Sequence, residues 1–119
     1  MAAQARGVGA ETRVCRTLEG QGWTVLLRRA RTACGEIDIV TEMPEAGLIA
    51  FIEVKARASF SAAACALSAS QRRRLLGAAS ILLGRHPHWA ERTLRFDLIL
   101  LDGAGCMRRI TDAFRLGDT

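Results

Sequence analysis

The chain has 119 residues, a net charge of +5 and 50% hydrophobic residues. This length suits one compact domain spanning residues 1–119, and the hydrophobic content excludes a disordered chain. No apolar run approaches the roughly 20 residues that a membrane helix needs, and residues 1–10 contain no apolar signal core. We therefore expect a cytoplasmic protein without membrane contact, with flexible ends at residues 1–7 and 115–119.

Hydrophobic periodicity predicts a helix, three strands, a second helix and one or two further strands, in that order. This order is typical of an α/β fold, with a mixed sheet flanked by helices and an α-β-β-β-α-β core. The helices are expected at residues 8–21 and 68–85, and the strands at residues 23–27, 36–41, 48–57 and 94–101, with a short last strand at 108–111.

The connections between these elements are read from turn residues and charge. Residues 28–35 are rich in arginine and are expected to form a connection into the second strand. Pro44 and Gly47 mark a hairpin turn at residues 42–47. Residues 58–70 are rich in Ala and Ser, and we expect a loop in their first part.

The four cysteines form no closely spaced pair of the kind that binds zinc. They are Cys15, Cys34, Cys65 and Cys106. We expect reduced, mostly buried thiols and no structural metal.

The positive net charge favours a polyanionic partner, because basic side chains release counterions from a phosphate backbone. Of the 17 basic residues, 16 are arginine, and the one lysine is Lys55. A genome biased toward arginine codons explains the arginines. The lysine then marks a position where arginine does not serve, such as one that needs a compact, titratable amine.

The second and third strands carry the acidic residues of interest. Alternation places Ile37 and Ile39 on one face of the second strand, and Glu36 and Asp38 on the other. In the third strand, Ala50, Ile52 and Val54 share one face, whereas the other face carries Phe51, Glu53, Lys55 and Arg57.

If the turn joins these strands into a hairpin, Asp38 and Glu53 emerge near each other, with Lys55 on the same face. Two carboxylates bind Mg²⁺ or Mn²⁺, and a neighbouring lysine can orient or deprotonate an attacking water or hold a phosphate. The alternative is a salt bridge on a solvated sheet face, which spacing alone favours.

The residues Glu11, Gly35-Glu36-Ile37-Asp38, Phe51-Ile52-Glu53-Val54-Lys55-Ala56-Arg57 and Arg95-Phe96-Asp97 resemble the pattern of the YraN family of small bacterial proteins of unknown function. That family resembles the PD-(D/E)XK nuclease superfamily, which includes archaeal Holliday-junction resolvases. The match runs from about Gly9 to Phe114, and it implies a restriction-endonuclease-like fold.

The resemblance also implies roles for individual residues. Asp38, Glu53 and the backbone carbonyl of Val54 would be metal ligands, and Lys55 the catalytic lysine. Glu11 would complete the site, although without the resemblance a helix-surface acid is the better interpretation. Glu36 is a candidate for the rim, and Asp97 matches the family without an assigned role.

The chain departs from the family pattern at three positions. Gln71 stands where lysine is usual, Ser61 where glycine is usual, and Arg29 where asparagine is common. We expect nucleic-acid contacts from the basic connection, the end of the third strand and the start of the second helix, with a solvated basic face as the alternative. These contact residues are Arg28, Arg29, Arg31, Arg57, Gln71, Arg72 and Arg73.

The leading hypothesis is a Mg²⁺- or Mn²⁺-dependent endonuclease acting on DNA, including branched DNA. A homodimer would suit a symmetrical junction. The alternatives are a nucleic-acid-binding module of the same fold that does not cut, and a protein-interaction domain.

Overall fold

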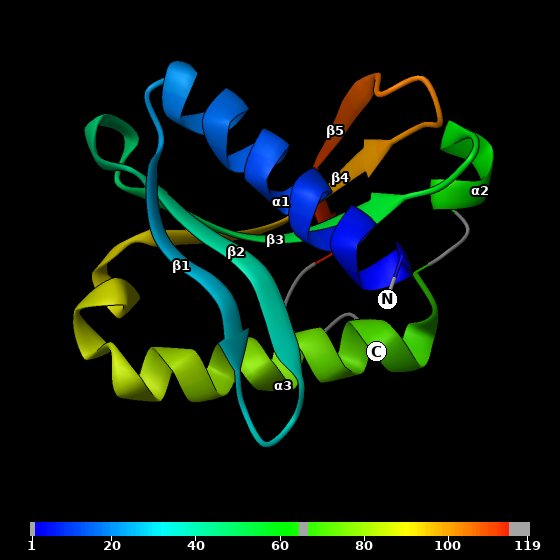
Figure 1. Cartoon of the computed structure of the whole chain (residues 1–119). Helices are drawn as coiled ribbons and strands as arrows, with labels where there is room; N and C mark the ends of the chain where they lie inside the picture. The colour runs from blue at the N-terminus through cyan, green and yellow to red at the C-terminus, as the bar shows by residue number, and fades with distance from the viewer. Residues whose placement is uncertain (1, 65–66, 115–119) are drawn as a thin grey trace.

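The computed structural model describes residues 2–64 and 67–114 and shows one five-stranded mixed sheet flanked by helices (Figure 1). The strand order is β1-β2-β3-β4-β5. Neighbouring strands are antiparallel except β3 and β4, which are parallel. This architecture confirms the predicted α/β class and is compatible with a restriction-endonuclease-like fold. The elements are α1 (Ala2–Gly20), β1 (Thr24–Arg31), β2 (Glu36–Met43), η1 (Pro44–Ala46), β3 (Leu48–Ala56), α2 (Phe60–Ala64), α3 (Ala69–Arg85), η2 (Pro87–Glu91), β4 (Thr93–Leu101) and β5 (Met107–Phe114).

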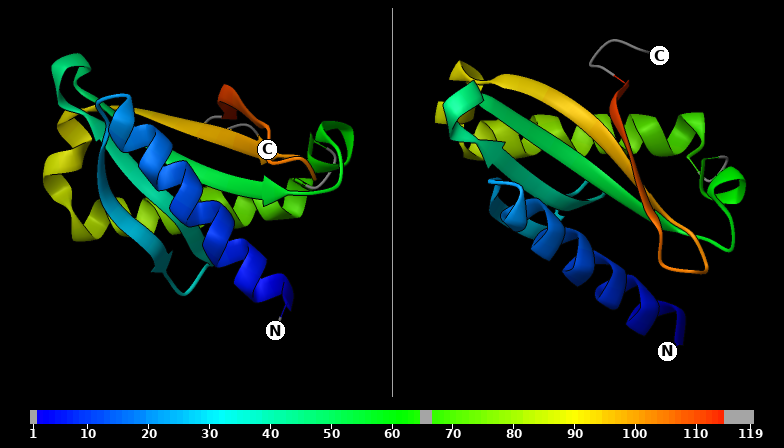
Figure 2. Two further views of the ribbon diagram at one scale, coloured as in Figure 1. Left: turned by 45° about the horizontal axis from the view of Figure 1, so that its top comes forward. Right: turned by 90° about the horizontal axis from the view of Figure 1, so that it is seen from above.

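The two long helices cover opposite faces of the sheet, as the views in Figure 2 show. On the α1 face, Val14 and Leu18 pack against Ile39 and Ile52 of the sheet. On the α3 face, the core cluster contains Leu75, Leu76, Ala79 and Leu82 of the helix together with Phe51 of β3. Each helix therefore buries one apolar stripe, as its 3.6-residue periodicity predicts.

The helix α3 begins within one residue of the predicted position. Its N-cap is Ser68, whose hydroxyl oxygen accepts a hydrogen bond from the backbone N–H of Gln71. Such a cap satisfies a donor that the helix itself cannot pair. The short helix α2 was not predicted, because its five residues, Phe60-Ser-Ala-Ala-Ala, are too few to show a helical period.

Strand β1 is longer than predicted and includes residues 28–31, the first half of the basic segment that was expected to be a connection. It pairs with β2 from Thr24 to Arg31, with a register shift between Val25 and Leu27. Arg29 adopts a left-handed backbone conformation, with φ of 51°. These irregularities interrupt the two-residue alternation from which a strand is recognised.

The expected alternation in β2 is wrong at its beginning. Ile39 packs in the α1 cluster, as expected for a residue opposite Ile52, but Ile37 packs in the α3 cluster with Leu75. The pleat therefore changes between these two residues. The pairing of β2 with β3 also ends there, at Ile39 and Ile52, so the strands part next to Asp38.

The cysteines depart from the expectation of mostly buried thiols. The structure describes three of them as free, with Cys15 buried but Cys34 and Cys106 exposed. Cys65 and residues 115–119 lie outside the described residues, and flexible ends stay a prediction. Within the described residues, no helix is long and apolar enough to cross a membrane.

Candidate active site

The site begins where β2 and β3 part. Beyond the Ile39–Ile52 pair, the Asp38 side chain takes the role of the missing strand partner: its Oδ2 accepts a hydrogen bond of 2.8 Å from the backbone N–H of Val54. This bond ties the Asp38 carboxylate to the middle of the sequence Glu53-Val54-Lys55. The parting of the strands thereby explains how an acid of β2 comes to lie beside an acid of β3.

Glu53 is buried, with 8% of its surface exposed. Its Oε2 accepts a hydrogen bond of 3.1 Å from Nε2 of Gln71 on α3 and lies 3.7 Å from Nζ of Lys55. Burial, followed by the hydrogen bond and the negative charge of Asp38, raises the pKa of Glu53 to about 9, although Lys55 opposes this shift. Without a bound cation, this raised pKa favours the protonated form of Glu53 at neutral pH.

Lys55 projects from the same face of β3 as Glu53, as the two-residue spacing predicted. Its side chain is 13% exposed, and that of Glu53 is 9% exposed. The salt bridge of the alternative interpretation is therefore present, but it lies on a largely buried face and not on a solvated one. An amine next to a carboxyl pair inside a cleft is the arrangement expected of a group that acts on a substrate.

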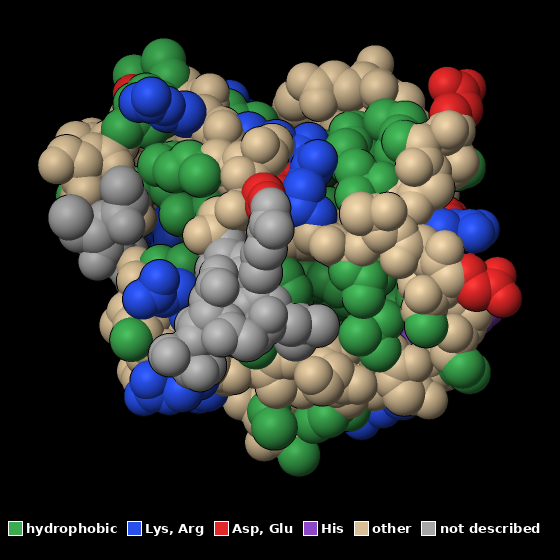
Figure 3. All heavy atoms as spheres, turned by 180° about the vertical axis from the view of Figure 1, so that it is seen from behind, with side chains coloured by type: hydrophobic (Ala, Val, Ile, Leu, Met, Phe, Trp, Pro, Cys, Tyr) green, Lys and Arg blue, Asp and Glu red, His purple; other side chains and the backbone are tan. Residues whose placement is uncertain are grey.

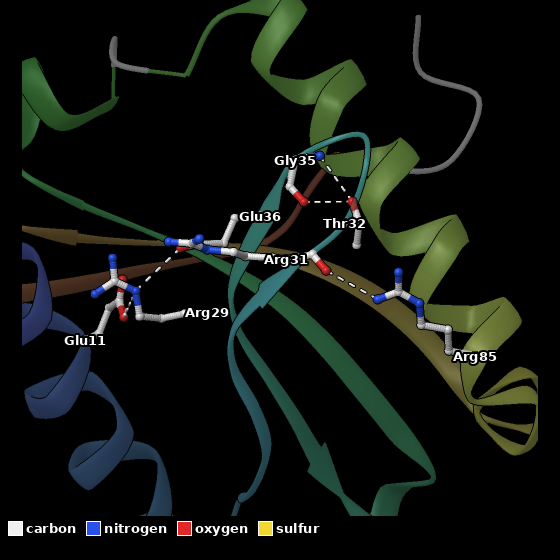
Figure 4. Close-up of polar contacts among 7 residues, drawn as sticks. All are labelled: Glu11, Arg29, Arg31, Thr32, Gly35, Glu36 and Arg85. Atoms are coloured by element: carbon white, nitrogen blue, oxygen red, sulfur yellow. Dashed lines mark hydrogen bonds and ion pairs between the residues drawn. The ribbon is translucent and has the colours of Figure 1, made fainter.

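Glu11 of α1 lines the same cleft as Asp38, Glu53 and Lys55. Only 6% of its surface is exposed, so the interpretation as a helix-surface acid is wrong. Burial raises the pKa of Glu11, the charge of Asp38 raises it further, and Arg29 opposes the shift. Glu36 also lines the cleft and lies 3.6 Å from Nε of Arg29 (Figure 4).

The acids and the lysine line one cleft of about 960 Å³. Sequence reasoning missed its far wall, which is the turn between β4 and β5. Arg13 of α1 reaches this turn and donates a hydrogen bond of 2.7 Å to the carbonyl of Gly105. The only signal in the sequence was the pair of glycines at 103 and 105. Residues lining the cleft include Glu11, Arg13, Glu36, Asp38, Glu53, Val54, Lys55, Arg57, Gln71, Asp102, Gly103 and Gly105.

The predicted nucleic-acid contacts divide into two groups. Arg57 and Gln71 line the cleft, whereas the lining does not include Arg28, Arg29, Arg31, Arg72 or Arg73. Arg28 donates a hydrogen bond to Thr12, and Arg31 pairs with Glu36 while its side chain is 84% exposed. On the face seen in Figure 3, Lys and Arg side chains form separate groups between hydrophobic areas. The role of these residues in binding nucleic acid stays a prediction.

Asp97 has a structural environment away from the cleft. It is fully buried, and its carboxylate accepts hydrogen bonds from the guanidinium groups of Arg95 and Arg109 and from the backbone N–H of Asp112. Asp112 has φ of 54°, beside the register shift between β4 and β5. Asp97 therefore fixes the irregular pairing of the last two strands.

The cleft offers carboxylate oxygens, which are the kind of ligand atom that a hard divalent cation prefers. Asp38 and Glu53 supply two carboxylates, and Glu11 contributes a buried Oε2 that makes no hydrogen bond. Among the described residues, no three His, Cys, Asp or Glu side chains already surround a common point. A cation would therefore be held by two carboxylates and complete its shell with water, as Mg²⁺ commonly does in proteins.

Comparison with known proteins identifies the family to which this chain is similar, but the description of that family names no activity. The model of the uncharacterised protein family UPF0102 matches residues 10–101. A UPF0102 protein of Granulibacter bethesdensis is 51% identical over 112 residues, which cover 94% of this chain and 70% of that protein. A UPF0102 protein of Azorhizobium caulinodans is 44% identical, with coverage of 97% and 86%. A third, of Rhodopseudomonas palustris, is 45% identical, with coverage of 96% and 86%.

Proposed function

The chain belongs to the uncharacterised protein family UPF0102, and from the geometry of its cleft we propose that it is a Mg²⁺- or Mn²⁺-dependent endonuclease of the cytoplasm. Its substrate would be nucleic acid, with DNA, including branched DNA, as the first candidate. The observation that carries the proposal is the convergence of Asp38, Glu53 and Lys55 where β2 and β3 part.

In this proposal Asp38 and Glu53 hold the cation, with the carbonyl of Val54 as a further ligand. A bound cation supplies Lewis acidity and neutralises charge that develops on the phosphate. Gln71 keeps the Glu53 carboxyl in place through its hydrogen bond. Asp38 is held in the same way by the Val54 N–H. The chain thus orients both carboxylates before any ligand arrives.

Lys55 is proposed to act on the nucleophile. Its Nζ lies beside Glu53 and can orient a water molecule toward phosphorus or accept a proton from it. The oxygen of that water would form the new bond to phosphorus, while the bond from phosphorus to one ester oxygen breaks. An arginine could hold the phosphate but could not accept the proton, because its pKa is too high. This difference accounts for a lysine in a chain whose other basic residues are all arginine.

The experiment is a cleavage screen of the purified protein with Mn²⁺ and with Mg²⁺. The substrates are linear duplex, single-stranded, flapped and four-way-junction DNA, and a single-stranded RNA. Lys55→Ala, purified in parallel, controls for contaminating nucleases, and Lys55→Arg tests whether positive charge alone suffices. The proposal predicts cleavage by the wild type and a loss of about 10²-fold or more in both variants. Absence of cleavage of every substrate, or equal cleavage by Lys55→Ala, contradicts it.

A second candidate is a nucleic-acid-binding module that does not cut. It is favoured by Gln71, which stands where lysine is usual in the resembled family pattern and whose side chain lies in the cleft, bonded to Glu53. Mn²⁺ titration separates the two functions. A nuclease binds Mn²⁺ and loses it in Asp38→Asn while DNA binding largely persists, whereas the module binds DNA alone.

A homodimer would bring two such clefts to a symmetrical substrate, and sedimentation with junction DNA tests this.

A further inference from the structure

Arg29 has the most unusual backbone of the residues around the cleft. It lies in the middle of β1, yet its φ is 51°, a region that residues other than glycine rarely adopt. The neighbouring residues Arg28 and Ala30 pair normally with Ile39 and Ile37 of β2. The left-handed conformation is therefore confined to Arg29 within an ordinary strand pairing. Sparsely populated conformations of this kind persist where the surrounding structure holds them, often at functional sites.

The result of this conformation is the position of the Arg29 guanidinium between two acids from different elements (Figure 4). Its Nε lies 3.9 Å from Oε2 of Glu11 on α1 and 3.6 Å from Oε1 of Glu36 on β2. Glu11 is more than nine-tenths buried, and the same Oε2 has no hydrogen-bond partner. A positive charge nearby stabilises the ionised form of such a buried carboxylate oxygen.

We infer that Arg29 is a built-in cation: its guanidinium occupies the place between Glu11 and Glu36 that a second divalent ion would otherwise take, so that the cleft holds one ion, at Asp38 and Glu53. This inference rests on the proposed function. A guanidinium neutralises the acids but has no open coordination position. It therefore balances the negative charge of Glu11 and Glu36 without acting as a second Lewis acid. The divalent ion is held only by Asp38 and Glu53.

The contacts of the neighbouring arginines single out Arg29 for this role. Arg31 also pairs with Glu36, at 3.2 Å, but its side chain is 84% exposed, against 37% for Arg29. Arg28 donates its bond to Thr12. Of these three arginines, Arg29 forms the ion pair with Glu11, the buried acid of α1.

The test is the number of Mn²⁺ ions bound per chain, counted by calorimetry and by the loss of the free-ion signal in electron paramagnetic resonance. Arg29→Asn removes the guanidinium and keeps a residue that tolerates positive φ. It should bind one more Mn²⁺ than the wild type, and Glu11→Gln added to it should abolish that extra ion. Arg29→Gly, which adopts positive φ without strain, gives a second variant in case the first does not fold. Arg31→Asn is the matched control and should leave the count unchanged.

The outcomes separate this inference from the proposed function. No gain of Mn²⁺ in a folded Arg29→Asn or Arg29→Gly variant overturns the role of Arg29, as does a gain that survives Glu11→Gln or one equalled by Arg31→Asn. A wild type that binds no Mn²⁺ overturns the metal site at Asp38 and Glu53. Even then, the inference about Arg29 is tested by whether Arg29→Asn or Arg29→Gly binds one Mn²⁺ ion more per chain than the wild type.

Discussion

Replacing Glu53 by glutamine should stabilise the protein in the absence of a cation, even though it removes a residue of the proposed site. In the folded protein, the pKa of Glu53 is raised from 4.5 to about 9, chiefly by burial and then by Asp38. The unfolded chain releases this proton near its ordinary pKa. Between these two values the folded state holds a proton that the unfolded state has lost, so the free energy of unfolding falls as pH rises.

The magnitude follows from the linkage relation, in which one proton is worth about 1.4 kcal/mol per pH unit. Over the range from pH 5 to pH 7.5 the contribution of Glu53 falls by up to about 3 kcal/mol. A glutamine at this position needs no proton: its amide can donate to Asp38 and its carbonyl can accept from Gln71. We expect Glu53→Gln to gain about 1 to 3 kcal/mol over the wild type at pH 7.5 and little at pH 5.

The assay is urea unfolding of the wild type and Glu53→Gln, with a chelator present, at several values between pH 5 and pH 8. The difference between the two proteins cancels the other titrating groups. Glu19→Gln makes the same substitution at an exposed position of α1 and reports the effect of removing an ordinary solvated carboxylate. A difference independent of pH, or a destabilised Glu53→Gln at pH 7.5, refutes the reasoning about the proton held by Glu53.

Three further results are expected. The affinity for Mn²⁺ should rise by up to tenfold per pH unit below the pKa of Glu53, because binding displaces its proton; calorimetry at pH 6, 7 and 8 checks this, and a flat profile contradicts it. Asp97→Asn should lower the free energy of unfolding by about 2 to 4 kcal/mol, since it leaves two partly exposed guanidinium groups without their buried anion. Urea unfolding measures this loss, and a loss below about 1 kcal/mol contradicts the structural role. Gln71→Ala should weaken Mn²⁺ binding several-fold without unfolding the chain, and Ser70→Ala, beside it on α3, should not.

The order of the elements could be predicted because the helices and central strands bury one regular stripe or face each. Leu75, Leu76, Ala79 and Leu82 recur at helical spacing, and Ser68 and Pro87 mark the limits of α3. The third strand also alternates as expected, which is why Glu53 and Lys55 were placed correctly on one face. Local pattern was sufficient wherever one face is buried and the strand pairing is regular.

The prediction failed where tertiary pairing overrides local pattern. The strand character of residues 28–31 arises from pairing with β2, and the left-handed Arg29 breaks the alternation. The same change of pleat sends Ile37 and Ile39 to opposite faces.

The residues of the candidate site also divide into those that the sequence predicts and those that depend on tertiary contacts. The proximity of Asp38, Glu53 and Lys55 could be predicted from strand alternation and the hairpin turn, and the family resemblance together with the rarity of lysine singled them out. The burial of Glu11 could not be predicted, because it depends on how α1 crosses the sheet. Nor could Arg13 be found, since its partner Gly105 lies 92 residues away in the chain. Contacts between distant segments are a property of the folded chain and leave no local pattern.

The most direct measurement of the central claim is the initial rate of Mn²⁺-dependent cleavage of the best substrate in the screen, with wild type and Lys55→Ala compared at equal concentration and equal folded fraction. The account predicts that the wild type cleaves the phosphodiester backbone and that Lys55→Ala is slower by about 10²-fold or more. Equal rates for the two proteins would contradict it.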